Sequence, residues 1–370
     1  MRFLVVTHIV HKATAEGYWG YEPYVREMNL WFKHVDEVVI VAPLSYKTPE
    51  AINAVYKCNK LQFIKVSAFG FHNLGSIFKS LFLIPYIFTK LLVEMRKADH
   101  IHLRCPGNMG LLGCVAQVIF PNKPKTAKYA GNWDPKAKQP WSYRLQKWLL
   151  SNEFLTRKMQ VLVYGEWPGQ TKNIKPFFTA SYGESKKVQR VLPSFESPYR
   201  FLYVGTLSKG KNPLYTVQLV EALNSKGISC YLDIYGEGSE MEVLIKYANE
   251  NGLSKIVKLH GNQNAGIVET AYKESQFLIL PSRSEGWPKV VAEAMFWGVI
   301  PIATNVSCVP WMLGFGERGL ILNMDLEKDV ASFLKTTGNT ALLQEMTLKA
   351  QAWSQEYTLE KFENEIKKLL

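Results

Sequence analysis

The stretch that decides the fold is Phe277–Thr304, which reads FLILPSRSEGWPKVVAEAMFWGVIPIAT. Its first four residues form a continuous apolar run, which is typical of a buried parallel strand. A polar loop carrying Glu285 follows, and Pro288 stands where a helix begins, a position that suits proline. Gly298 ends the helix, and the apolar run after it predicts a second strand. This order of strand, loop, helix and strand indicates a βαβ unit.

The loop of this unit has the chemistry of an anion site. A helix that begins at a strand's carboxyl end aims free N–H groups and the positive end of its dipole at a ligand. Glu285 precedes the helix, and Glu293 lies on its second turn. In a structural interpretation Glu285 complements the dipole and Glu293 is solvated. In a functional one both accept hydrogen bonds from sugar hydroxyls beside a phosphate, and the spacing alone does not choose between them.

A second segment of this kind is Tyr203–Pro213, YVGTLSKGKNP. A strand ends at Gly205, and the polar loop after it carries Lys209 and Lys211. A glycine turn with lysines at the end of a strand suits a phosphate cradle, although the Walker pattern GxxxxGK[ST] is absent. The alternative is an ordinary turn with surface lysines. Tyr235–Gly238 (YGEG) is a weaker signal of the same type.

The alternation of short apolar runs with amphipathic stretches extends along the whole chain. It predicts an α/β fold with two Rossmann-like doubly wound domains that face each other across a cleft. The non-periodic stretch Val191–Arg200 (VLPSFESPYR) separates them, so we expect an N-terminal domain over 1–192 and a C-terminal domain over 193–350. Thr340–Leu370 is predicted to be helical. In the first half we expect strands at Phe3–Thr7, Glu37–Ala42, Leu61–Val66, His100–Leu103, Lys125–Tyr129 and Val161–Val163.

Composition excludes several classes of protein. With 370 residues, of which 47% are hydrophobic, the chain is neither disordered nor collagen-like. The net charge of +12 is uneven, because residues 1–195 carry 27 Lys and Arg against 12 Asp and Glu, whereas the rest carry 17 against 20. A basic half suggests a face for anionic lipid, a diphosphate-bearing substrate or nucleic acid; the alternative is a solvated surface without a partner. We expect no nucleic acid, because RNA-recognition signatures and zinc-finger spacings are absent.

Location is predicted from the cysteines and from the apolar segments. Five cysteines without a CxxC pair indicate reduced thiols in a cytoplasmic protein. Met1–Val10 has too short an apolar run for a signal peptide and is predicted to be the first strand. Ser76–Val93 is apolar but is interrupted by two lysines and a proline, and it is short for a membrane span. It is either a buried helix, which we prefer, or a helix that dips into the membrane surface.

Taken together, these segments resemble the retaining family-4 glycosyltransferases of the GT-B fold, in the glycosyl transferases group 1. Glu285 to Glu293 (EGWPKVVAE) matches the Glu-x7-Glu signature of that family. The segment from Gly205 to Lys211 matches its glycine-turn-to-lysine segment, and Tyr235–Gly238 matches its central glycine pair. The resemblance is strong over about residues 200–325 and weaker over the first 195, where the family varies because this half binds the acceptor.

The resemblance implies a donor site in the C-terminal domain. A UDP- or GDP-sugar would be the donor, no cofactor would be needed, and the acceptor would be a glycan or lipid-linked glycan of a cell-surface polysaccharide. Glu285 would be the catalytic contact to the transferred sugar, Glu293 would hold the ribose, and Lys211 the diphosphate. The helix over 351–370 would pack back on the N-terminal domain. The other implied donor contacts are Gly20 (in the loop after the first strand), Gly205, Thr206, Lys209, Gly236, Gly286 and Trp287.

Two departures from the family pattern affect this site. Thr206 stands where the family usually has an arginine that pairs with the diphosphate, so Lys209 or Arg283 would have to supply that charge. In KYAGN, residues 128–132, Gly131 replaces the usual histidine near the sugar. The candidates for contacts to the sugar or the acceptor are then Arg104, Asn132, Trp133 and Asp134.

The implied mechanism retains the anomeric configuration without a metal. A double displacement needs two carboxylates about 5–5.5 Å apart, and no second carboxylate has the pattern of a nucleophile. No His or Cys cluster has metal-binding spacing either. In the family, the leaving diphosphate deprotonates the acceptor on the same face of the sugar. The alternatives are a nucleotide-sugar epimerase or sugar-phosphate synthase of the same fold. The expected location is the cytoplasm, with peripheral contact to anionic lipid at the inner face of the membrane.

Overall fold

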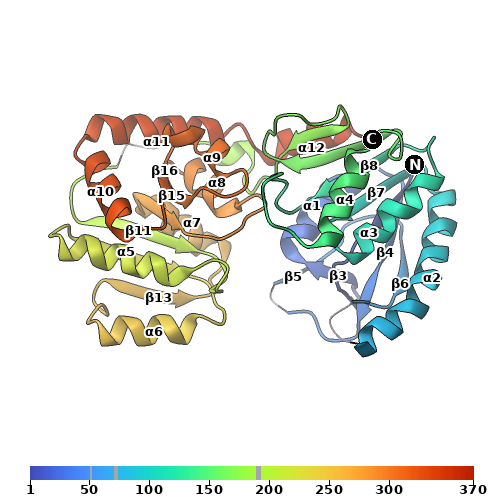
Figure 1. Ribbon diagram of the computed structural model, residues 1–370, viewed down its shortest axis with the longest axis horizontal. Helices are drawn as coiled ribbons and strands as arrows, with labels where there is room; N and C mark the ends of the chain where they lie inside the picture. The colour runs from blue at the N-terminus through green and yellow to red at the C-terminus, as the bar shows by residue number, and fades with distance from the viewer. Residues whose placement is uncertain (51, 71–73, 189–192) are drawn as a thin grey trace. The chain divides into compact units, whose positions relative to one another are not determined.

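The computed structural model describes residues 1–50, 52–70, 74–188 and 193–370 (Figure 1). The chain forms two compact units. The N-terminal unit comprises Met1–Phe178 and Phe362–Leu370, and the C-terminal unit comprises Thr179–Lys361. The sequence placed the boundary after residue 192, in a stretch that lies outside the described residues. The division falls earlier because residues 179–188 bond within the C-terminal unit; for example, the Ser181 hydroxyl donates to Glu293.

The N-terminal unit is built on a parallel sheet in the order β10-β9-β8-β7-β1-β4-β6. All six strands predicted for this half are confirmed; five of them are mostly buried in the sheet, whereas β6 is mostly exposed or partly buried. Their bounds are β1 (Arg2–Val6), β4 (Glu37–Ser45), β6 (Leu61–Val66), β7 (His100–Cys105), β8 (Lys125–Tyr129) and β9 (Met159–Tyr164). The edge strand β10 (Ile174–Phe177) was not predicted.

A small hairpin next to β4 was also missed. It consists of β2 (His11–Thr14) and β3 (Gly17–Tyr21), which pair antiparallel, and β5 (Asn53–Val55) pairs with β3. The prediction that Gly20 lies in a loop is therefore wrong: Gly20 lies in β3, opposite Ala54. A Cβ atom there would lie 3.1 Å from Val25 Cγ2 and 3.5 Å from the His11 ring. The glycine lets the hairpin pack closely against the residues beneath it.

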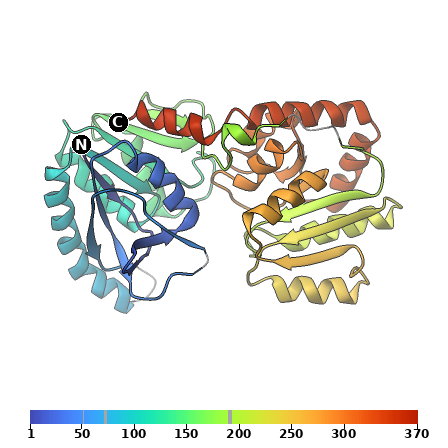
Figure 2. The same cartoon turned by 180° about the vertical axis from the view of Figure 1, so that it is seen from behind.

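Helices cover both faces of the N-terminal sheet. On one face α1 (Glu22–Phe32) places Trp31 in a stack against Phe3, with ring centroids 5.7 Å apart. Figure 2 shows α1 in dark blue over this face. On the other face α2 (Leu74–Lys97), α3 (Asn108–Ala116) and α4 (Trp141–Ser151) share one apolar core with β1. A 3-10 turn, η1 (Gln117–Ile119), follows α3. None of the helices in the described ranges is both long and apolar enough to cross a membrane.

The C-terminal unit has a six-stranded parallel sheet in the order β13-β12-β11-β14-β15-β16. The chain adds β12 and β13 on one side of β11, then crosses over and adds β14, β15 and β16 on the other. The topological switch point therefore lies between β11 and β14, where ligands bind in doubly wound sheets. The strand bounds are β11 (Tyr199–Val204), β12 (Cys230–Tyr235), β13 (Val257–Gly261), β14 (Phe277–Leu280), β15 (Ile300–Thr304) and β16 (Leu320–Leu322).

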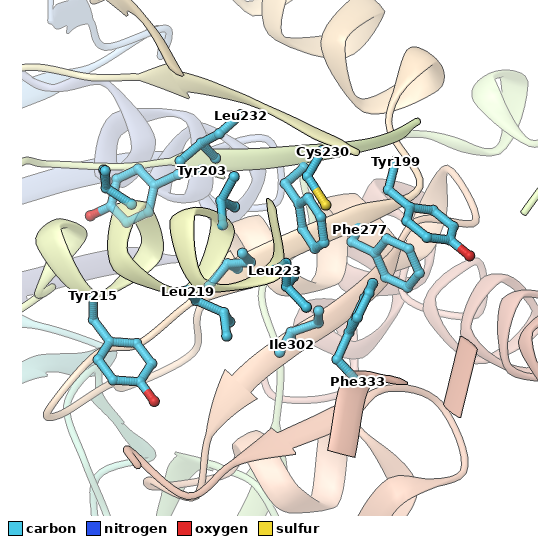
Figure 3. Close-up of a cluster of buried hydrophobic side chains, with 14 of the residues drawn as sticks. Tyr199, Tyr203, Tyr215, Leu219, Leu223, Cys230, Leu232, Phe277, Ile302 and Phe333 are labelled. Carbon is cyan, nitrogen blue, oxygen red and sulfur yellow. The ribbon is translucent and has the colours of Figure 1, made fainter. Parts of the chain in front are cut away.

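An aromatic core holds this sheet to its helices (Figure 3). The Phe201 and Phe277 rings stack with centroids 5.3 Å apart, and Phe333 packs edge-on at 5.1 Å from Phe277. The helices are α5 (Pro213–Ser225), α6 (Met241–Glu250), α7 (Ala265–Glu274), α8 (Lys289–Phe296), α9 (Val309–Met312), α10 (Leu326–Thr337) and α11 (Thr340–Ser354), with 3-10 turns η2 (Glu184–Lys186) and η3 (Gly314–Gly316).

The stretch predicted to be helical, Thr340–Leu370, forms two helices with a break between them: α11 ends at Ser354, and α12 (Leu359–Lys367) begins after a turn. Thr358 causes the break. Its hydroxyl accepts a hydrogen bond from the Lys361 backbone N–H at 3.2 Å, which is the geometry of a helix N-cap. The end of α12 belongs to the N-terminal unit, where Phe362 packs against Phe177 at 5.4 Å.

Candidate functional site

The two loops singled out in the sequence lie side by side at the switch point of the C-terminal unit. One follows β11 and carries Lys211; the other follows β14 and carries Glu285. The backbone N–H of Arg283 in the second loop donates to the Gly210 carbonyl in the first, at 2.8 Å. The carboxyl ends of adjacent parallel strands thus bring the two motifs together, as the βαβ pattern predicts.

The centre of this arrangement is an ion pair between the two loops. Lys211 Nζ lies 2.6 Å from Glu285 Oε1. The Glu285 side chain is 7% exposed and that of Lys211 is 31% exposed. A buried carboxylate is costly unless it is paired, and Lys211 supplies that pair while keeping part of its ammonium accessible. The sequence placed both residues in the site but did not predict their contact.

A third loop joins the site through two glycines. Gly236 and Gly238 follow β12 and adopt φ values of +140° and +155°, which favour glycine. A Cβ atom on Gly236 would lie 1.9 Å from the Gly205 carbonyl oxygen, and one on Gly238 would lie 2.2 Å from that of Leu207. The glycine pair therefore permits a backbone approach that other residues would block. Gly238, which was not among the predicted site residues, has the same role as Gly236.

The loop after β14 is held at its middle. The Gly286 carbonyl accepts hydrogen bonds from Ser307 Oγ at 3.3 Å and from Cys308 Sγ at 3.1 Å. Burial raises the pKa of the Cys308 thiol to about 12, so it stays protonated and acts as a donor. The backbone N–H groups of Glu285 and Gly286 donate to no other residue in the described part of the chain. These two donors are available to an anion at the head of α8.

Proline stands one position earlier than predicted. Pro288 is the N-cap of α8, which begins at Lys289, and the Val291 N–H donates to the Pro288 carbonyl at 3.0 Å. Within α8, Val291, Ala294 and Met295 are buried, whereas Val290 is only partly buried. The helix therefore presents its carboxylate on the opposite side.

That carboxylate, Glu293, is fixed by two hydroxyl groups. Ser181 Oγ donates to Oε1 at 2.5 Å, and Tyr272 Oη donates to Oε2 at 3.1 Å. Tyr272 is fully buried, and its burial next to Glu293 raises the pKa of its hydroxyl well above the usual value. The interpretation of Glu293 as a merely solvated helix residue is wrong, because the side chain is half-buried and oriented by neighbours from two other segments.

Three further residues considered for the diphosphate lie on the same two loops. Thr206 and Lys209 are exposed, and so is Arg283. Since Arg283 N–H bonds to Gly210, Lys209 and Arg283 sit on loops that contact each other. Within the described ranges, no group of three His, Cys, Asp or Glu side chains could hold a metal ion.

The side chain of Trp287 turns away from this edge into an aromatic cluster. Its indole stacks on Trp353 of α11 with centroids 6.1 Å apart and contacts the Tyr357 ring edge-on at 5.8 Å. Trp287 is buried, so only its backbone is placed to meet a ligand. The sequence did not predict these partners, because they lie more than one helix away along the chain.

Comparison with known proteins identifies the larger part of this unit. Residues 184–347 match the family model described as glycosyl transferases group 1. They form a glycosyl transferases group 1 domain. A glycosyltransferase of Haemophilus influenzae that is otherwise uncharacterized is 30% identical over 171 residues, which cover 46% of this chain and 48% of that protein. The lipopolysaccharide 1,6-galactosyltransferase of Salmonella typhimurium is 32% identical over 120 residues, 32% of this chain and 33% of that protein.

The glycosyl transferases group 1 domain lies in a chain with the GT-B fold. The crystal structure of HepE from Anabaena, in complex with UDP and glucose, matches with a TM-score of 0.67 and 14% sequence identity, covering 100% of this chain and 98% of that one. Sequence matches to the two curated relatives above, in contrast, span about half of their length or less. The fold of two Rossmann-like α/β units predicted from the sequence is confirmed.

The four residues predicted as acceptor or sugar contacts lie outside the group 1 domain, at one edge of the N-terminal sheet. One of them, Trp133, is buried and packs edge-on against the Tyr129 ring at 4.8 Å. Arg104 is the last residue but one of β7, and its guanidinium donates to Glu27 at 3.1 Å. Asn132 and Asp134 follow the neighbouring strand β8, and the Asn132 side chain accepts from the Asp134 N–H at 2.9 Å. Directly before Asn132, a Cβ atom on Gly131 would lie 3.1 Å from Pro106, so the loop is tight where the resemblance would place a histidine.

Proposed function

We propose that this chain is a retaining glycosyltransferase. It would move a sugar from a UDP- or GDP-sugar to a glycan or lipid-linked glycan acceptor in cell-surface polysaccharide synthesis. The observation that carries the proposal is the Lys211–Glu285 ion pair at the switch point of a glycosyl transferases group 1 domain. The Salmonella relative, a lipopolysaccharide galactosyltransferase by name, supports the class of product, and the UDP-bound HepE structure has the same fold.

In this proposal Lys211 holds the diphosphate of the donor. An ammonium group has three N–H donors, and one of them points to Glu285. The others are free to meet phosphate oxygens at the accessible side of the pair. Each charge-assisted hydrogen bond of this type contributes about 1.5–3 kcal/mol. Glu285 keeps the ammonium in position while its second oxygen accepts hydrogen bonds from hydroxyls of the sugar.

The same groups would stabilise the transition state. As the bond from the sugar's anomeric carbon to the phosphate oxygen breaks, negative charge grows on the leaving diphosphate. Lys211, an exposed cation at Lys209 or Arg283, and the N–H groups of Glu285 and Gly286 face that charge. The acceptor hydroxyl loses its proton to the leaving diphosphate while its oxygen bonds to the anomeric carbon on the same face. No metal or additional cofactor takes part in this proposal.

Glu293 would bind the ribose of the donor. Each carboxylate oxygen accepts more than one hydrogen bond, so those from Ser181 and Tyr272 leave acceptor capacity on both oxygens. The two hydroxyls hold the Glu293 carboxylate in one orientation before the donor arrives. The entropy cost of binding the ribose is therefore lower. In the N-terminal unit, Arg104, Asn132 and Asp134 would contact the acceptor, and Gly20 would lie close to the donor phosphate.

A panel of nucleotide-sugars tests this proposal. A ligand that binds the folded state raises the melting temperature, so the natural donor should produce the largest shift and should release its nucleoside diphosphate rapidly only with an acceptor present. Lys211→Met should abolish the shift, whereas Lys226→Met, which removes an exposed lysine at the end of α5, should retain it. An epimerase would convert the donor alone. Binding to random DNA or RNA, without a shift from any nucleotide-sugar, would overturn the proposal.

A further inference from the structure

The outer face of α4 is apolar and aromatic where a solvated helix would be polar. Trp141, Leu145 and Trp148 follow each other at helical spacing on the exposed side, and the two indoles are 63% and 58% exposed. Arg144 lies in the same exposed stripe. After the helix, Phe154 is 71% exposed, with the Arg157 guanidinium 4.7 Å from the centre of its ring. Exposed aromatic groups of this number mark an interaction surface.

A second stripe of the same type runs along α2. Phe78, Phe82 and Tyr86 are spaced four residues apart, and all three are more than half exposed. The rings of Phe78 and Phe82 contact each other edge-on at 5.2 Å. The prediction of a buried helix here is correct for one side only. The side with Ile87 and Leu91 is buried against the sheet, and the opposite side is apolar as well.

The two stripes belong to one layer of helices. α2, α3 and α4 bury their inner sides in one core on the same face of the N-terminal sheet, with α3 packed against both neighbours (Figure 1). α3 and the turn after it expose Val115 and Ile119 between the stripes. We call this surface the helical face; its exposed apolar residues are Phe78, Leu81, Phe82, Tyr86, Val93, Val115, Ile119, Trp141, Leu145, Trp148 and Phe154.

The charge of this layer is strongly positive. The helices α2, α3 and α4 together contain six Lys and Arg against one Glu. α4 contains no acidic residue, and the one acidic residue of α2, Glu94, is buried and paired with Arg2 at 2.9 Å. Cations lie directly beside the exposed rings, as in the pair of Lys90 and Tyr86, with 4.6 Å between Nζ and the ring centre.

We propose that the helical face binds the surface of an anionic lipid bilayer. Tryptophan and tyrosine suit the boundary between headgroups and acyl chains, because each has an apolar ring and a polar tip. Arg144, Lys90 and Arg157 lie among the rings, where they meet lipid phosphates, and each such charge near an anionic surface strengthens binding. A second copy of the chain would instead bring two strongly positive faces together. The proposal stands on this surface alone and is independent of the proposed transferase activity.

Cosedimentation with vesicles tests the proposal. We expect the full chain to bind vesicles with one quarter phosphatidylglycerol at least tenfold more tightly than pure phosphatidylcholine vesicles, and less tightly at high salt. The double variant Phe82→Ser/Trp148→Ser should lose at least tenfold in binding to the anionic vesicles. Phe315→Ser, which removes a ring that is 76% exposed in the C-terminal unit, should bind like the unaltered chain.

The outcomes of these experiments show whether the helical face binds lipid or a second copy of the chain. Failure of the unaltered chain to prefer anionic vesicles overturns the proposal even if the double variant does not fold. Dimers that form without lipid and dissociate in the double variant would assign the face to a second copy instead. The shift in melting temperature produced by a nucleotide-sugar should be equal in both variants, so that a failure of lipid binding is distinguishable from a failure of the donor site.

Discussion

Glu285 and Lys211 come from loops that follow different strands, and their side chains meet at 2.6 Å between Oε1 and Nζ. The pair therefore depends on β11 and β14 being neighbours at the switch point of the sheet. A shift of either loop would separate the Glu285 carboxylate from the Lys211 ammonium. The charge balance of the site therefore depends on the positions of both loops.

Replacing Glu285 by glutamine should leave the shape of the site intact but remove its negative charge. We expect the transfer rate to fall by a factor of at least about 100, a change on the order of 3 kcal/mol in the barrier, because the contact to the reacting sugar is lost. The Kd for the donor should change less, since Lys211 keeps its charge. Single-turnover transfer and calorimetry measure the two effects. A variant with full activity would exclude Glu285 from the catalytic contact.

Tyr272 should act on the donor through Glu293. Tyr272→Phe removes the hydroxyl that donates to Oε2, so the carboxylate is less well oriented and KM for the donor should rise about three- to tenfold with little change in kcat, which corresponds to about 1 kcal/mol. Tyr247→Phe is the matched control, because it breaks a Tyr–Glu hydrogen bond of 2.6 Å to Glu221 elsewhere in the unit. Equal KM values in both variants would contradict an orienting role.

The glycine pair after β12 gives a prediction for stability. Gly236→Ala should lower the free energy of unfolding by more than about 2 kcal/mol, because its Cβ atom would overlap with the Gly205 carbonyl and one of the two loops would have to move. Gly252→Ala separates this overlap from backbone strain, since Gly252 also has positive φ (+67°) but open space around it. Its cost should be on the order of 1 kcal/mol. Urea denaturation of both variants measures the loss of stability caused by the overlap against the loss caused by backbone strain alone.

The N-terminal unit should lose stability in mild acid. Burial lowers the pKa of His11 and of His100 to about 4, against a usual value of 6.5. Between these values the unfolded chain binds more protons than the folded one, so the free energy of unfolding decreases as pH falls from 6.5 to about 4 and is insensitive to these groups above that window. The slope is about 1.4 kcal/mol per pH unit for each histidine.

Denaturation midpoints at a series of pH values between 7.5 and 4.5 measure this slope. In the folded protein the Nε2 atom of His11 lies 2.7 Å from Tyr56 Oη. His11→Gln replaces this ring with a side chain that does not titrate, so the slope should decrease by the contribution of one histidine, about 1.4 kcal/mol per pH unit. Unchanged slopes in this variant would show that His11 does not remain neutral in the folded protein.

The parts of the fold with strong apolar periodicity were predictable. The run FLIL and the helix beginning after Pro288 appear within one residue of their predicted bounds, because burial on both faces of a parallel strand leaves a clear pattern. The hairpin HKAT and GYWGY was missed, since it is short and partly exposed and its residues do not alternate. Its strands exist because β4 and β5 pair with them, which is tertiary information.

The residues of the candidate site were likewise predictable from the sequence only in part. Glu285, Lys211 and the glycines were recognised because each lies in a short local motif. Ser181 and Tyr272, which orient Glu293, lie 112 and 21 residues away from it along the chain, and no local pattern marks them. Contacts of this kind are set by packing between elements and become visible only in three dimensions.

The stack of Trp287 on Trp353 links the loop after β14 to α11, which follows the last strand of the sheet in the chain. During synthesis, the sheet of the C-terminal unit is complete once Leu322 has left the ribosome, but the ring that supports the loop is still missing. A nascent chain that stalls before Trp353 would therefore hold all the residues of the proposed donor site without their aromatic support. Nucleotide-sugar binding should thus appear only after Trp353 has left the ribosome.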